Sequence, residues 1–261
     1  MFLLNRFLLS AVAALIIIFS CSRQAPSQPA VKGLKNIVLV HGAYADGSSW
    51  AKVIEILQGK GYNVVSVQNP LTSLQDDVVA TKRAIALMDG PVLLCGHSSA
   101  GMVITEAGNE SKVAGLLYAS ALIPNDGQSV LDVVKGYPSA GGDGETREDA
   151  SGFLLLSEKG IYENFVQDLP PAERKVVYAT QGPWGKKFLT EKITTAAWKT
   201  KPSWCIIASE DRSVNPDLER AEAKMIKATT LELRSAHVSM LSHPKEVAAF
   251  MIEAASKLPP R

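Results

Sequence analysis

The sequence predicts an α/β fold in which a six-stranded, mostly parallel core sheet is flanked by helices. Short apolar runs alternate with amphipathic stretches along most of the chain, and such repeated strand–helix units imply parallel strands joined by right-handed crossovers. One of these strands turns abruptly into a helix at a serine, Ser98. One long stretch, residues 123–201, breaks the alternation and indicates an insertion between two strands.

Each core element has its own sequence pattern. Helices are expected at 48–58 and 73–88, where apolar residues recur at helical spacing, and the second opens with Ser73 followed three residues later by Asp76. A final helix opens at Pro244. The expected core strands are short and mostly apolar, and they cover residues 37–40, 63–67, 91–95, 113–119, 204–208 and 230–233.

The turn at Ser98 is typical of an activated nucleophile. The strand 91–95 leads into a helix that begins near Ser99, so the Ser98 hydroxyl is lifted out of the sheet above the positive end of that helix. Gly96 leaves room for the strained turn, and the small Ala100 lets the helix lie close to the strand. Ser98 is therefore the candidate nucleophile, although Ala100 replaces the last glycine of the stricter Gly-x-Ser-x-Gly pattern.

A serine nucleophile needs a base, and the chain contains four histidines. Strand alternation points His97 away from Ser98, so we interpret it as a packing residue, whereas His41 ends the first core strand and is expected to brace the following loop. His237 lies in the loop after the last core strand, and His243 precedes the final helix. We predict His237 as the base, with His243 as the alternative.

The base in turn needs an acid at the end of another strand. The segment Ser-Glu-Asp-Arg follows the strand 204–208, and we predict that its aspartate, Asp211, orients His237. Glu210 is the alternative, and Asp217 is interpreted as a carboxylate at a helix start capped by Asn215. The resulting chain order is serine, aspartate, histidine.

Two backbone amides are candidates for binding the oxyanion of a tetrahedral intermediate. The amide of Ser99 follows the nucleophile and lies at a helix N-terminus. The loop after the first core strand begins His-Gly-Ala, and Gly42 permits an unusual backbone turn that would aim the amide of Ala43 into the site. We predict an oxyanion hole formed by the amides of Ala43 and Ser99.

Three parts of the chain carry a resemblance to a known family. They read IVLVHGAYADGSSWAKVIEILQGKGYNVVSVQNPLTSL at 37–74, GHSSAGMVITEAG at 96–108, and ASEDRSVNP with SAHVSMLSHPKEVA at 208–216 and 235–248. The chain resembles the α/β-hydrolase superfamily from about 36 to 258, and within it the small bacterial serine esterases related to the plant methylesterase and hydroxynitrile lyase branch. The resemblance implies a triad of Ser98, Asp211 and His237.

The resemblance also implies a reaction. The expected activity is hydrolysis of small, largely apolar carboxylic esters through an acyl-enzyme intermediate, without a cofactor. A lyase or other non-hydrolytic reaction on the same triad is one alternative, and a ligand-binding lipoprotein without catalytic activity is another. No metal is expected, because the cysteines are dispersed and no His-x-x-x-His pair occurs.

The insertion at 123–201 is expected to form a helical cap over the candidate site. It begins Pro-Asn-Asp-Gly at 124–127, contains a glycine-rich segment at 140–144, and continues in pieces with helical character that carry several aromatic and aliphatic side chains. Those side chains are Phe153, Leu154, Leu155, Tyr162, Phe165, Val176, Val177 and Tyr178. Trp184 and Trp198 are candidates for lining an acyl or alcohol pocket.

The N-terminus predicts export from a bacterial cell. Arg6 is followed by an apolar run at 7–19 that is too short to span a membrane unaided, so residues 1–20 are interpreted as an export signal. Ile-Phe-Ser-Cys before and at Cys21 resembles a bacterial lipobox, which predicts a lipid anchor on Cys21 and a periplasmic or outer-membrane location; ordinary signal cleavage nearby is the alternative. Residues 21–35 then form a polar tether to the hydrolase domain at 36–261.

Composition fits a single domain that acts on a small molecule. The 261 residues are 46% hydrophobic and 20% charged, which is enough for a substantial core. Removing residues 1–20 takes away one arginine and no acidic residue, so the net charge falls from +1 to zero. A neutral chain with no long basic run gives no reason to expect nucleic-acid binding. Cys95 and Cys205 lie in separate strands and are interpreted as buried apolar side chains.

Overall fold

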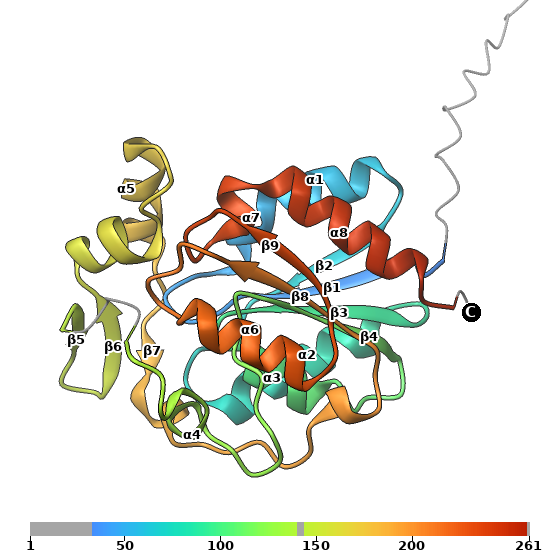
Figure 1. Ribbon diagram of the computed structural model, residues 1–261, viewed down its shortest axis with the longest axis horizontal. Helices are drawn as coiled ribbons and strands as arrows, with labels where there is room; N and C mark the ends of the chain where they lie inside the picture. Colours follow the sequence, from blue (N-terminus) through green and yellow to red (C-terminus); the bar gives the residue numbers. More distant parts are fainter. Residues whose placement is uncertain (1–32, 140–143, 260–261) are drawn as a thin grey trace, which may run out of the picture.

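The computed structural model describes residues 33–139 and 144–259, which form a sheet covered by helices on both faces (Figure 1). The export signal, Cys21 and most of the tether lie outside the described residues. The six core strands are β1 (Asn36–Val40), β2 (Asn63–Val67), β3 (Val92–His97), β4 (Val113–Ala119), β8 (Ser203–Ala208) and β9 (Thr229–Leu233). They pair in the order β2-β1-β3-β4-β8-β9, every pair parallel. The predicted fold class is confirmed.

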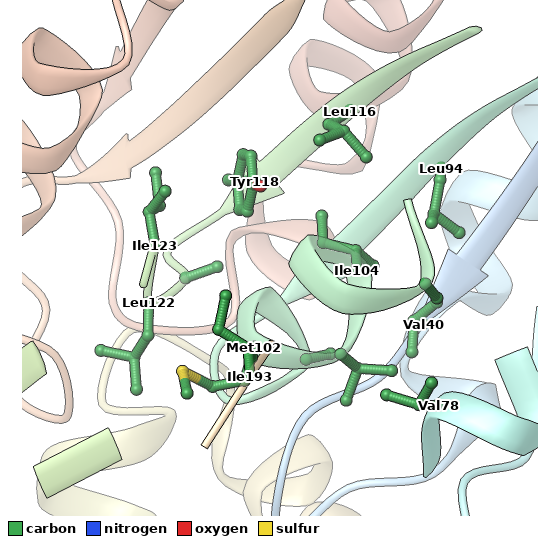
Figure 2. Packing of buried hydrophobic residues seen from close by; sticks show 14 of the residues in the cluster. Val40, Val78, Leu94, Met102, Ile104, Leu116, Tyr118, Leu122, Ile123 and Ile193 are labelled. Carbon is green, nitrogen blue, oxygen red and sulfur yellow. The ribbon is translucent and has the colours of Figure 1, made fainter. Parts of the chain in front are cut away.

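The helices divide between the two faces of the sheet. One face is covered by α1 (Ala51–Gly59), the short α7 (Ser239–Ser242) and α8 (Pro244–Ser256), and the other by α2 (Leu74–Leu87), α3 (Ala100–Ala107) and α6 (Pro216–Met225) (Figure 1). A 3-10 turn, η1 (Gly47–Trp50), precedes α1. Figure 2 shows the core on the α2–α3 side, where Leu94 and Leu116 of the sheet pack near Ile104 of α3.

Neighbouring residues of one strand belong to different cores. Val38 packs in the cluster beneath α2 and α3, while Ile37 and Leu39 pack in the cluster beneath α1 and α8, and all three side chains are fully buried. Successive side chains of a strand point to opposite faces, so a parallel sheet covered on both sides is apolar at every position. The continuous apolar runs in the sequence have this cause.

Side-chain caps fix where two of the helices begin. Ser73 accepts a hydrogen bond of 3.0 Å from the amide of Asp76 at the start of α2, as the sequence predicts. Asn215 accepts one of 2.8 Å from the amide of Asp217 at the start of α6, where Pro216 occupies the first helical position. Each cap satisfies a backbone N–H that would otherwise have no partner within the helix.

The segment between β4 and β8 carries the cap. Its described elements are α4 (Val130–Val134), β5 (Thr146–Glu148), β6 (Phe153–Leu156), η2 (Gly160–Phe165), α5 (Pro171–Thr180), β7 (Trp184–Gly185), η3 (Lys186–Leu189) and η4 (Ala197–Lys199). Three of these form a small antiparallel sheet in the order β5-β6-β7. Its centre is the stretch Phe153–Leu156, so the expectation of helix at Phe153, Leu154 and Leu155 is wrong. Backbone hydrogen bonds to the nearby β5 and to the distant β7 favour the extended form there, and the apolar pattern of these residues does not reveal that pairing.

The cap is joined to the core through β7. The amide of Gly185 donates a hydrogen bond of 2.7 Å to the carbonyl of Leu71, and a Cβ at Gly185 would lie 2.4 Å from the carbonyl oxygen of Thr72. Only glycine allows this close approach of the two backbones. Beside it, Trp184 meets Tyr44 of the core edge-on, with ring centroids 5.7 Å apart. Within the described part of the chain, no helix is long and apolar enough to cross a bilayer.

Candidate active site

Ser98 lies in a strained turn between β3 and α3. Its φ of +56° is in the left-handed region, which residues other than glycine rarely adopt. A Cβ at Gly96 would lie 2.8 Å from the carbonyl oxygen of Ala100, and one at Gly42 would lie 2.7 Å from the Ser98 Cβ. The two glycines therefore make room for the turn, Gly96 as the sequence predicts and Gly42 from the neighbouring loop.

Asp211 and His237 form a buried pair at the ends of β8 and β9. Asp211 Oδ2 lies 2.6 Å from His237 Nδ1, and both side chains are completely buried. Asp211 Oδ1 accepts hydrogen bonds from the amides of Ser213 and Val214 at 2.6 and 2.9 Å, which hold the carboxylate in place. A charged acceptor makes such hydrogen bonds short and strong.

The alternative acids lie elsewhere. Glu210 forms an ion pair of 2.6 Å with Arg234, and Asp217 forms one of 2.7 Å with Arg220; all four side chains are at least 41% exposed. The alternative base, His243, lies at the start of α8, where Nδ1 is 2.9 Å from the Ser242 hydroxyl.

The second ring nitrogen of His237 is free to act. Nε2 is buried and has no hydrogen-bond partner among the residues that the structure describes, and His237 and Ser98 line the same cavity. The ring is held between His97 and Phe165, whose ring centroids lie 4.5 and 5.0 Å from it. With Nδ1 taken by Asp211, Nε2 is the position from which the ring can accept a proton in the cavity.

His97 has a wider role than the packing role predicted for it. Its Nε2 lies 3.0 Å from the carbonyl oxygen of His237, and because a carbonyl only accepts, the His97 proton resides on Nε2. Burial, and next the neighbouring His237, hold the pKa of His97 well below its usual value, so the ring is neutral. Strand alternation does point it away from Ser98, but the sequence did not reveal that it holds the backbone of the candidate base.

The remaining histidine braces a loop, as expected. The amide of Asn69 donates to His41 Nε2 at 3.0 Å, and the Asn69 side chain donates to the His41 carbonyl at 2.9 Å. Burial lowers the pKa of His41, in keeping with a neutral ring that accepts at Nε2. This pair ties the loop that carries Ala43 to the loop after β2.

The amide of Ala43 faces the site, but its hydrogen bond goes to a side chain. Ala43 N–H donates to Ser99 Oγ at 2.9 Å, and both residues line the cavity with Ser98. Ser99 itself is buried and precedes the first residue of α3. The structure therefore brings the two predicted oxyanion donors to one place and adds a hydroxyl between them that the sequence did not single out.

The cavity at Ser98 has a volume of about 240 Å³ and is enclosed jointly by core and cap. Its apolar lining comes from Ala43, Tyr44, Leu122, Val130, Val134, Leu156, Phe165, Trp184, Leu189 and Val214. Polar lining groups include Glu145, Thr146, Asn164 and Arg212. Trp184 is therefore at the pocket, as predicted, whereas Trp198 is not: its indole donates to the carbonyl of Pro124 at 2.8 Å. Among the described residues, no group of histidine, cysteine and carboxylate side chains is arranged to hold a metal ion.

Comparison with known proteins identifies the family. The model of the alpha/beta hydrolase family matches residues 37–250. The chain belongs to the alpha/beta hydrolase family. The match confirms the family resemblance and the serine hydrolase class that the sequence predicts.

Relatives and solved structures cover nearly the whole domain. Salicylic acid-binding protein 2 of Nicotiana tabacum is 22% identical over 256 residues, which is 85% of this chain and 98% of the relative. The structure of polyneuridine aldehyde esterase superposes with a TM-score of 0.72 at 19% identity, covering 85% of this chain and 99% of that one. A pyrethroid hydrolase from Sphingobium faniae gives a TM-score of 0.72 at 20% identity, covering 85% and 98%. At these identities the solved structures establish the shared fold.

Proposed function

We propose that this alpha/beta hydrolase cleaves small, largely apolar carboxylic esters with Ser98, Asp211 and His237 as its catalytic triad. The observation that carries the proposal is the buried Asp211–His237 pair, 2.6 Å apart: its Nε2 has no hydrogen-bond partner in the described part of the chain, and His237 lines one cavity with Ser98, which lies in a strained turn. A nucleophile, a base and an acid that orients the base at one cavity are the groups that acyl transfer requires.

The reaction follows from these positions. Ser98 Oγ attacks the ester carbonyl while His237 Nε2 takes its proton, and Asp211 stabilises the imidazolium that forms. His237 then returns the proton to the departing alkoxide, which leaves as the alcohol and yields an acyl-enzyme. A water molecule, deprotonated by the same nitrogen, attacks this ester and releases the acid and the free Ser98.

The cavity supports a small and mostly apolar substrate. Aromatic walls from the core and the cap, Tyr44, Phe165 and Trp184, bury apolar surface of a ligand close to the nucleophile. A cavity of about 240 Å³ beside Ser98 accommodates a compact ester. The name of polyneuridine aldehyde esterase agrees with ester chemistry on this fold, and that of the pyrethroid hydrolase agrees with hydrolysis.

A panel of nitrophenyl esters with short and long acyl chains tests the proposal. We expect hydrolysis to be fastest for short acyl groups, and we expect Ser98→Ala to lower turnover by three to six orders of magnitude, roughly the loss seen when a nucleophile of such a triad is removed. Ser98 should also be labelled by a fluorophosphonate. A folded protein that binds esters but neither hydrolyses them nor reacts with the probe would contradict the proposal and favour a ligand-binding role.

We also propose that the protein is exported and held at a bacterial membrane by lipid on Cys21. The proposal rests on the basic start, the short apolar run and the Ile-Phe-Ser-Cys segment. The described domain begins after the polar tether, so the domain would sit beside the membrane rather than within it.

A further inference from the structure

A second buried carboxyl group lies against Asp211. Glu219, on α6, is only 3% exposed, and its Oε2 accepts a hydrogen bond of 3.1 Å from the amide of Ala208. Ala208 ends β8, and its carbonyl accepts from the amide of Asp211 at 3.2 Å, so Glu219 is fixed at the turn that carries Asp211. Its other oxygen, Oε1, is buried and receives no hydrogen bond from any donor in the described part of the chain.

Glu219 lies at the turn that carries Asp211, and among the charged groups around it Asp211 acts on it most strongly. Two buried carboxyl groups at one site repel each other unless one of them carries a proton. Asp211 already accepts three hydrogen bonds, from the amides of Ser213 and Val214 and from His237 Nδ1. Each of these stabilises the ionised form of Asp211.

Glu219 lacks such support for a negative charge. It accepts one hydrogen bond, and none of the ion pairs within residues 33–139 and 144–259 includes it. A buried carboxylate without a cation is costly, so the proton belongs on Glu219. The remaining titratable groups around it are Glu222 on the same helix and Cys205 on β8, and neither is a cation at neutral pH.

The expected protonation agrees with the surroundings. Burial, and next the charge of Asp211, hold the pKa of Glu219 well above its usual value, although the amide of Ala208 acts in the opposite direction. Glu222 is also buried, and its pKa is raised by burial as well.

We propose that Glu219 is a positioning residue that donates a hydrogen bond from its protonated carboxyl group to Asp211. The bond disperses the negative charge of Asp211 and fixes its orientation, and in this way it limits the basicity of His237. The inference rests on the proposed function, because it assigns Glu219 a part in the same triad. It adds a fourth group to the line Glu219, Asp211, His237, Ser98.

The pH profile of kcat/KM on a nitrophenyl ester tests the catalytic consequence. Glu219→Leu removes the donor and leaves the charge of Asp211 undispersed, so the acid limb of the profile should move up by about 0.5–1 pH unit, with kcat about tenfold lower and KM within twofold. In Glu219→Gln the side-chain amide can still accept from the amide of Ala208 and donate to Asp211, so this variant should retain the wild-type acid limb. Glu222→Leu is the matched control, because Glu222 is equally buried on α6 but holds the amide of Ile123 at 2.9 Å.

A stability series tests the proton itself and needs no catalysis. When folding raises the pKa of a carboxyl group, the stability of the folded state falls as the pH rises above the pKa of that group in the unfolded chain. A glutamine at position 219 does not titrate, so the variant lacks this loss. The Tm of Glu219→Gln minus that of wild type should therefore increase from about pH 4.5 upward. This measurement stays decisive if Glu219→Leu fails to fold.

The outcomes separate this inference from the proposed function. A shifted acid limb in Glu219→Gln, the same shift in Glu222→Leu, or a Tm difference independent of pH would each overturn the role of Glu219. If wild type hydrolyses no ester and does not react with fluorophosphonate, the proposed function fails, and the stability series still decides where the proton lies.

Discussion

The backbone N–H of Ala43 donates a hydrogen bond of 2.9 Å to the hydroxyl of Ser99, the residue that follows Ser98. An amide hydrogen shared with a neutral hydroxyl is less available to an oxyanion that forms in the same cavity. A developing oxyanion is the stronger acceptor, because hydrogen bonds to charged groups are roughly twice as strong as neutral ones. The Ser99 hydroxyl must therefore give way before Ala43 can serve the proposed oxyanion hole.

Ser99→Ala should raise kcat/KM. The variant removes the competing acceptor, and one neutral hydrogen bond of about 1 kcal/mol corresponds to roughly a fivefold gain. The measurement is steady-state kinetics on a nitrophenyl ester, with Ser99→Thr as the control that keeps the hydroxyl. A fall in kcat for Ser99→Ala would instead mean that the hydroxyl itself donates to the oxyanion.

Asp211→Asn should lower kcat by roughly a thousandfold or more while the fold is kept. The amide can still accept from Ser213 and Val214, but it no longer stabilises the imidazolium and it disturbs the histidine tautomer. Glu210→Gln is the matched control, since its exposed carboxylate pairs with Arg234. If Glu210→Gln is the damaging change and Asp211→Asn is mild, the acid of the triad is Glu210 and not Asp211.

His237→Ala should abolish both ester hydrolysis and fluorophosphonate labelling of Ser98, because the hydroxyl then has no base. His243→Ala should leave the rate nearly unchanged and affect mainly stability, since His243 contacts Ser242 at the start of α8. Labelling rates and Tm values of the two variants are compared under the same conditions. Equal loss of labelling in the two variants would mean that the loss comes from unfolding, and it would contradict the assignment of His237 as the base.

Asp77 should make stability depend on pH. Burial raises the pKa of Asp77 to about 7, even though the amide of Leu71 donates to it at 2.8 Å; nearby Asp76 and Glu191 raise it further. The folded state thus retains a proton that the unfolded chain releases near pH 4, so stability falls between about pH 4 and pH 7 and then levels off.

Asp77→Asn removes this titration and keeps an acceptor for Leu71. The Tm of the variant should gain on that of wild type between about pH 4 and pH 7, as measured by thermal unfolding monitored by circular dichroism. A constant difference across this range would show that Asp77 is ionised in the folded protein.

Lipid attachment should be visible at the N-terminus of the exported protein. In the native host, we expect the mature chain to begin at Cys21, to carry acyl mass on that residue and to partition with membranes. Intact-mass and peptide analysis of the membrane and soluble fractions checks this, with Cys21→Ala as the control. A soluble mature form that begins at another residue would end the proposal.

The sequence alone determined the succession of core strands and helices along the chain. Buried parallel strands must be apolar at every position and helices must follow helical spacing, so both patterns are readable locally, as are the Ser73 and Asn215 caps. The positions of Ser98, Asp211 and His237 were predictable as well, because each lies in the turn or loop that follows a core strand. In a parallel sheet the carboxyl ends of all strands meet at one edge.

Only the tertiary structure decided which elements contact one another. The pairing of Phe153–Leu156 with β5 and β7, the hydrogen bond from Ala43 to Ser99, and the place of Glu219 at the turn that carries Asp211 each join elements whose own patterns do not indicate the partner. Glu219 reads in the sequence as an ordinary polar residue on an amphipathic helix. It is buried and protonated because the fold brings it against a carboxylate and away from any cation, and electrostatics of that kind depend on distance in space rather than on spacing along the chain.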